Sequence, residues 1–158
     1  MSIERVKDFF AQYGMENRIK EFNVSSATVE LAADALKCEP CRIAKTLSFM
    51  VGSKPILIVT AGDAKIDNQK YKAQFGTKAK MLKPDETVSL IGHAVGGICP
   101  FAVNEGVSVY LDISLKRFDT VFPACGSSNS AIELTIAELE KYSSYISWID
   151  VCKGWNEK

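Results

Sequence analysis

Only one histidine, His93, occurs in the sequence, and common signatures of catalysis and of membrane association are missing. No Gly-x-Ser-x-Gly motif is present, which argues against a hydrolase with a serine nucleophile on a sharp turn. No stretch approaches the ~18 consecutive apolar residues that a membrane span needs, and the N-terminal residues lack the apolar core of a signal peptide. We therefore expect a cytoplasmic protein without membrane contact.

The chain also lacks an excess of charge of either sign, since 19 Lys and Arg balance 19 Asp and Glu over 158 residues. This balance argues against a broadly basic nucleic-acid coat and against an acidic tail. The distribution is nevertheless uneven, because residues 65–83 hold six lysines and one acidic residue, Asp67. Such a patch can follow a phosphate backbone, although a solvated helix face is the simpler interpretation from composition alone. The six lysines are Lys65, Lys70, Lys72, Lys78, Lys80 and Lys83.

Internal repeats, low-complexity segments and linkers rich in Pro, Gly or Ser are missing too, so we expect one domain over residues 1–158. The five cysteines are an odd number in a chain long enough to bury its own core. Both facts favour free thiols over a disulfide framework.

Short helices and short strands alternate along the sequence. The clearest β signal is a pair of apolar runs, 46–51 and 55–61, separated by Gly52, Ser53 and Lys54 as in a hairpin. Further extended segments are predicted at 19–24, 80–82, 107–113, 120–123, 131–135 and 148–151. Helices are predicted at 2–14, 28–36, 67–75, 84–91 and 135–142, and another from Pro40 toward Lys45. This order predicts an α+β fold, with a mixed and largely antiparallel sheet flanked by short helices.

Cys38-Glu-Pro-Cys41 is a possible thiol redox motif, which would need an activated first cysteine. Such a motif usually follows a buried strand, whereas residues 31–37 have a helical pattern, so a structural turn is favoured. A zinc site needs about four ligands, and neither His93 nor the other cysteines show ligand spacing. We predict no metal and no cofactor.

The segment 92–101 (GHAVGGICPF) contains three glycines and one proline. Unshielded backbone N–H groups beside glycines can hold a carbonyl oxygen or a developing oxyanion, and a plain tight turn is an equal alternative. Cys99 in this loop is a candidate nucleophile with His93 six residues away, but proximity in sequence does not establish contact.

Lys45 lies in the apolar context Ile43-Ala44-Lys45-Thr46-Leu47, at the start of a predicted strand. A lysine that points inward there is partly desolvated and can hold a phosphate or a carbonyl group. A surface lysine at a strand end is the simpler alternative.

Together these segments resemble the YbaK-type aminoacyl-tRNA deacylases, free-standing relatives of the editing domain inserted in bacterial prolyl-tRNA synthetases. The resemblance spans about residues 25–145. It is carried by 44–49, by 57–62 followed by Lys65-Ile66-Asp67, by the loop 92–101, and by 122–126 leading into 132–134.

The resemblance implies a compact α+β domain that hydrolyses the ester between a wrong amino acid and tRNA without metal or cofactor. It makes Lys45 the active-site lysine, and it places Gly96, Gly97 and Pro100 in a loop whose amides face the aminoacyl carbonyl. No protein nucleophile is implied; a water or the terminal ribose hydroxyl takes part. The expected partners are the 3′ acceptor end of aminoacyl-tRNA, which the six lysines contact, and prolyl-tRNA synthetase.

The amino acid is left open among Cys, Ala, Ser and Thr. We predict further substrate contacts from Phe49, His93, Ile98, Cys99, Ser127 and Ser128. A non-catalytic module that binds aminoacyl-tRNA or an amino acid, and a thiol redox protein that uses Cys38 and Cys41, remain as alternatives.

Overall fold

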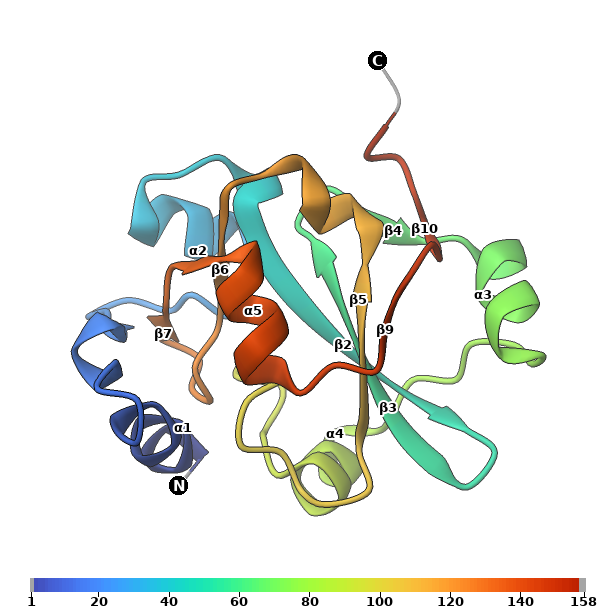
Figure 1. The fold of residues 1–158 in the computed structure, drawn as a ribbon, viewed down its shortest axis with the longest axis horizontal. Helices are drawn as coiled ribbons and strands as arrows, with labels where there is room; N and C mark the ends of the chain where they lie inside the picture. The colour runs from blue at the N-terminus through green and yellow to red at the C-terminus, as the bar shows by residue number, and fades with distance from the viewer. Residues whose placement is uncertain (1, 157–158) are drawn as a thin grey trace.

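A six-stranded mixed sheet in the order β8-β6-β2-β3-β5-β9 organises the fold (Figure 1). The computed structural model describes residues 2–156. The strands are β1 (Lys20–Glu21), β2 (Ile43–Val51), β3 (Lys54–Ala61), β4 (Lys65–Ile66), β5 (Ser108–Asp112), β6 (Thr120–Pro123), β7 (Ser130–Ala131), β8 (Leu134–Thr135), β9 (Ser147–Ile149) and β10 (Cys152–Lys153).

The antiparallel hairpin of β2 and β3 lies at the centre of this sheet, as the two apolar runs predict. Its turn includes Gly52, whose φ of 62° falls in the left-handed region that glycine adopts without strain. Outward from the hairpin, β6 joins β2 and β5 joins β3 in parallel, and β9 joins β5 in parallel. The remaining pairs, β6–β8, β1–β7 and β4–β10, are antiparallel. The predicted α+β fold with a mixed sheet is therefore confirmed, but the six-stranded sheet is less antiparallel than predicted, because three of its five strand pairs are parallel.

Short helices flank the sheet, and side-chain caps begin several of them. The helices are α1 (Ser2–Ala11), α2 (Val29–Leu36), α3 (Asn68–Phe75), α4 (Pro84–Glu86, continued by a wider turn Thr87–Ile91) and α5 (Ile136–Ser143). The Asp67 carboxylate accepts hydrogen bonds from two backbone N–H groups at the start of α3. Thr135 and Glu138 form a reciprocal capping box at α5.

Three local predictions were wrong in detail. The helix expected from Pro40 toward Lys45 is a single 3-10 turn that ends at Arg42, because Ile43 already pairs within the sheet. The strand expected at 131–135 is divided into β7 and β8. The segment 80–82 contributes only an isolated β-bridge, between Met81 and Phe49.

An aromatic cluster joins α1 and α5 to the loop 92–101. The Phe10 ring lies 4.9 Å from that of Phe101 and 5.5 Å from that of Tyr142, centroid to centroid. Phe10 and Phe101 are completely buried. This packing fixes the end of the loop against the core. Among residues 2–156, no helix has the length and apolar character to cross a membrane.

Candidate functional site

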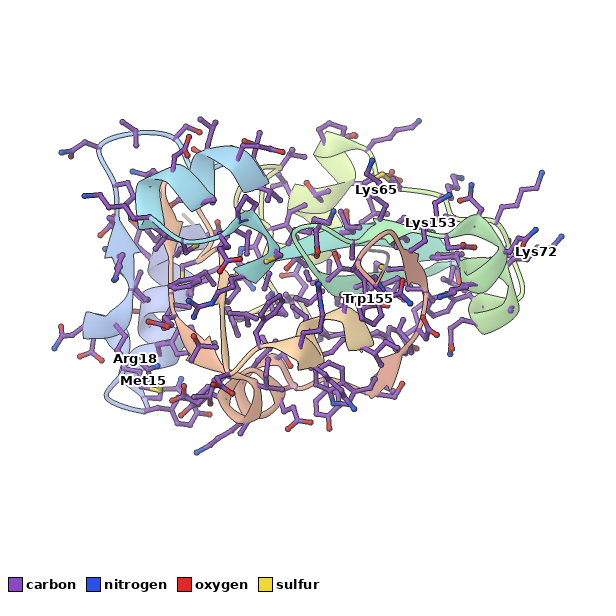
Figure 2. All side chains as sticks on the ribbon, turned by 90° about the horizontal axis from the view of Figure 1, so that it is seen from above. Met15, Arg18, Lys65, Lys72, Lys153 and Trp155 are labelled. Carbon is purple, nitrogen blue, oxygen red and sulfur yellow. The ribbon has the colours of Figure 1, made fainter. Side chains whose placement is uncertain are left out.

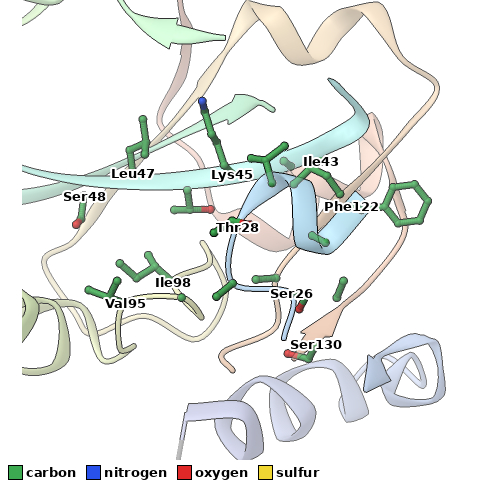
Figure 3. A pocket seen from close by; sticks show the side chains of 18 of the residues that line it. Ser26, Thr28, Ile43, Lys45, Leu47, Ser48, Val95, Ile98, Phe122 and Ser130 are labelled. Carbon is green, nitrogen blue, oxygen red and sulfur yellow. The ribbon is translucent and has the colours of Figure 1, made fainter. Parts of the chain in front are cut away.

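A cavity of about 300 Å³ lies beside β2 (Figure 3). This volume is at the lower end of the ~300–1,000 Å³ usual for ligand pockets. Its lining comes from residues 26–29 and 32 around the start of α2, 43–48 of β2, and 95, 96 and 98 of the glycine-rich loop. Residues 81, 122, 124, 130 and 131 complete it. Among these described lining residues, Lys45 alone carries a charge.

The cavity lies at a gap in the backbone pairing of β2. On the edge away from β3, β6 pairs with the first two residues of β2, and segment 80–82 bonds to the backbone of Ser48 and Met50 at 3.2 and 2.8 Å. Peptide groups along a strand alternate between its two edges, so Thr46 uses the same edge as Ser48 and Met50. Its backbone N–H and C=O therefore face the gap.

Lys45 is half-buried in the cavity wall, where it lies opposite Thr60 of β3. No hydrogen bond or ion pair joins its ammonium group to another residue of the part that the structure describes. Burial lowers the pKa of Lys45, against smaller raising effects of Cys152 and Asp63. Figure 3 shows the ammonium group pointing away from Val95 and Ile98. An unpaired, partly desolvated cation of this kind can bind an anionic or carbonyl oxygen of a ligand.

The glycine-rich loop reaches the cavity through Gly96 and Ile98. Gly96 has φ of 93°, and the Gly97 N–H donates to Ala94 O at 3.0 Å, closing a turn. A Cβ on Gly97 would lie 2.6 Å from Ser127 N, so only glycine allows this close backbone contact. Within residues 2–156 the N–H groups of Gly96 and Ile98 have no hydrogen-bond partner. These two amides, unlike that of Gly97, are unpaired in the described part of the chain.

Cys99 and His93 do lie together, but in the core and not in the cavity. The Cys99 Sγ is 3.6 Å from His93 Nε2, and that nitrogen donates to Phe101 O at 2.7 Å. Cys99 is completely buried and His93 is 1% exposed. Burial raises the pKa of Cys99 to about 12 and lowers that of His93. The pair is therefore a packed structural contact, and Cys99 is not an accessible nucleophile.

Several other predicted substrate contacts lie outside the cavity. Phe49 is buried and packs its ring 5.2 Å from that of Tyr71. The Ser127 hydroxyl bonds to Asn129 and Ser130, so it is satisfied within its own turn. Also outside the lining are Ser128, which is exposed, and Pro100, which is buried. Of the residues predicted for catalysis or substrate binding, Lys45, Gly96 and Ile98 line the cavity.

The lysine patch is exposed apart from one member. Lys70 donates to Asp150 Oδ1 and to Cys152 O, both at 3.0 Å, and is thereby tied to the C-terminal segment. Lys65 pairs across β4–β10 with Lys153, a neighbour that the sequence did not indicate (Figure 2). The other exposed members are Lys72, Lys78, Lys80 and Lys83. The patch therefore presents lysines on β4, on α3 and on the segment that follows α3.

The geometry of the described residues supports neither a redox role for Cys38 and Cys41 nor a metal site. Burial raises the pKa of both Cys38 and Cys41, which is opposite to the lowered pKa of an activated thiol. No group of three or more His, Cys, Asp or Glu among the described residues is arranged to hold a metal ion.

Much of the cavity lining was missed at the sequence level. Ala27, Val29, Phe122 and Ala131 come from segments distant in sequence, and each is a small or apolar residue typical of any core. The cap of α2 is Thr28, whose hydroxyl accepts from the Leu31 N–H, and it lies in this wall. An apolar residue can be assigned to the cavity wall only once the pairing of the strands is known.

Comparisons with known proteins agree with one another. A sequence profile described as the aminoacyl-tRNA editing domain matches residues 24–142. A Bacillus subtilis (strain 168) protein described as uncharacterized protein YwhH is 56% identical over 156 residues, covering 98% of this chain and 99% of that protein. The proline–tRNA ligase of Geobacillus sp. (strain WCH70) is 28% identical over 102 residues, which are 64% of this chain and 18% of the ligase. A crystal structure described as a candidate trans-editing enzyme for prolyl tRNA synthetase superimposes with a TM-score of 0.86 at 27% identity, over 97% of this chain and 98% of that one.

Proposed function

The chain belongs to the aminoacyl-tRNA editing domain family, and from this premise we propose that it hydrolyses the ester bond of mischarged aminoacyl-tRNA as a free-standing enzyme. The proposed substrate is tRNA-Pro that carries a small amino acid such as Cys, Ala, Ser or Thr. Similarity to proline–tRNA ligases and to a structure described as a candidate trans-editing enzyme supports the choice of tRNA.

One observation carries the catalytic part of the proposal. Lys45, whose ammonium group is unpaired, lines the same small cavity as Gly96 and Ile98, whose backbone N–H groups have no partner among residues 2–156. In the proposed reaction the two N–H groups stabilise the negative charge that develops on the ester carbonyl oxygen. Lys45 holds an anionic or ester oxygen of the aminoacyl end and so positions it.

The proposed reaction uses no protein nucleophile, and the candidate thiol Cys99 is buried outside the cavity. A water oxygen attacks the ester carbonyl carbon, with the neighbouring hydroxyl of the terminal ribose orienting the water. The bond between that carbon and the ribose oxygen breaks, and the ribose oxygen takes the proton from water. The products are the free amino acid and tRNA with its terminal hydroxyl restored.

The exposed lysines contact phosphates near the acceptor end, with an affinity that falls as salt rises. The chain has no net charge, so little positive surface remains outside the lysine patch. We therefore propose that it contacts only this end of the tRNA. We place the reaction in the cytoplasm, with prolyl-tRNA synthetase as the source of mischarged tRNA and a candidate partner.

The test is deacylation of tRNA-Pro charged with Cys, Ala, Ser or Thr. The wild type should hydrolyse at least one of these faster than a Lys45→Ala variant does. If none is hydrolysed faster, the proposal fails. If charged tRNA is bound but its ester decays at the rate seen in buffer, the alternative of a non-catalytic binding module is correct.

A further inference from the structure

Five hydroxyl-bearing side chains line the cavity, and they differ in whether the protein itself satisfies them. Ser26, Thr28 and Ser130 each hydrogen-bond to a neighbouring protein group, at 3.4, 3.2 and 2.7 Å respectively. The Thr46 hydroxyl is buried without a partner. Ser48 is 3% exposed, and among residues 2–156 no hydrogen bond involves its hydroxyl.

These two free hydroxyls lie on one face of β2. Residues two apart in a strand share a face, so Thr46 and Ser48 point to the same side. Figure 3 shows Ser48 directed away from Lys45 and Leu47, toward the side where Val95 and Ile98 lie. Both side chains therefore lie on the side of β2 where Val95 and Ile98 line the cavity.

A polar group that is buried without a partner costs free energy until a ligand supplies one. The part of a ligand that reaches these hydroxyls should therefore carry a hydrogen-bonding group of its own. A hydroxyl meets this need best, since it donates to one neighbour and accepts from another. A methyl group would leave both protein hydroxyls unpaired, and a thiol is a weak donor and acceptor.

We propose that Thr46 and Ser48 select an aminoacyl side chain that bears a hydroxyl, so that seryl and threonyl esters are the preferred substrates. This inference rests on the proposed deacylase function and narrows its substrate. The hydroxyl of the substrate bonds to both residues, while Val95 and Ile98 contact the carbon atoms of its side chain.

The α-amino group of the substrate is the competing partner for these hydroxyls, and it is common to every aminoacyl ester. The backbone already offers that group an acceptor, because the Thr46 C=O faces the gap in the edge of β2. The two roles differ in their consequences. Hydroxyls that bind the α-amino group would affect all aminoacyl esters equally, whereas hydroxyls that bind the side chain affect seryl and threonyl esters alone.

The experiment compares kcat/KM for Ser-tRNA-Pro and Ala-tRNA-Pro, two substrates that differ by one hydroxyl on the same tRNA. We expect the wild type to prefer the seryl ester by at least about tenfold, from hydrogen bonds made with one substrate only. The double variant T46V/S48A should reduce this preference to within about threefold, mainly through slower hydrolysis of the seryl ester. If the double variant folds poorly, Thr46→Ser serves as a second variant. It keeps a hydroxyl and should retain the preference for the seryl ester.

Thr60→Val is the matched control, since Thr60 is buried in the neighbouring strand and its hydroxyl bonds to Ala61 O outside the cavity. It should leave the seryl preference unchanged. A wild type that prefers the alanyl ester, or a double variant that slows both esters equally, would overturn the inference while hydrolysis itself still supports the deacylase. If no ester is hydrolysed at all, the deacylase function and this inference fail together.

Discussion

Replacing Lys45 by methionine removes the charge at the cavity wall and keeps an unbranched side chain. No hydrogen bond or ion pair with another described residue is lost, because the Lys45 ammonium group makes none. Burial already disfavours its charged form, as the lowered pKa indicates. We therefore expect Lys45→Met to leave the free energy of unfolding at neutral pH unchanged or slightly higher.

The effect on deacylation should be much larger. Two unit charges about 4 Å apart interact by about 4 kcal/mol at an effective dielectric constant of about 20. Loss of one preorganised contact of this type usually costs about 10²–10³ in rate, or ~2.7–4 kcal/mol. We expect a loss in kcat/KM within this range for Lys45→Met, together with a normal melting temperature.

The assay follows the ester under single-turnover conditions, with spontaneous hydrolysis subtracted. Lys7→Met is the matched control, because Lys7 pairs with Glu21 on the surface and lies outside the cavity. It should retain the wild-type rate. A Lys45→Met variant that folds normally and hydrolyses within threefold of the wild type would refute the role given to the charge.

Three further expectations concern the loop, the buried thiol and pH. Gly97→Ala places a Cβ 2.6 Å from Ser127 N, so we expect a lower melting temperature and a displaced loop with at least tenfold slower deacylation; a wild-type rate would contradict this. Cys99→Ala should keep deacylation within a few-fold of the wild type, and abolished activity in a folded variant would restore Cys99 as a nucleophile. The Arg18 guanidinium holds the pKa of Glu138 at about 2, so their contribution to stability is present above pH ~4.5 and declines as pH falls toward 2. Denaturation of the wild type and Arg18→Ala should show a stability difference that shrinks in this window; a constant difference would argue against the linkage.

Local chemistry in the sequence located most helices and the central hairpin. The caps at Asp67 and at Thr135–Glu138 act within one turn, so they do not depend on the rest of the fold. Pairing between distant segments left no such signal. The parallel neighbours of β2 and β3 depend on crossover connections, which residue periodicity does not encode.

The same distinction applies to the site. Lys45 and the loop with Gly96 stood out because charge in an apolar strand and clustered glycines are unusual locally. His93 and Cys99 stood out as well, yet tertiary packing buries them beside Phe101. The unpaired hydroxyl of Thr46 could not be foreseen, since it depends on which side chains the fold brings next to it.

The most direct measurement of the central claim is single-turnover hydrolysis of misacylated and correctly acylated tRNA-Pro by the same preparation. The proposed function predicts release of free amino acid and intact tRNA from a misacylated substrate, fastest for the seryl or threonyl ester, while Pro-tRNA-Pro persists. Decay of every misacylated ester at the rate seen without protein, or equally fast hydrolysis of Pro-tRNA-Pro, would contradict it.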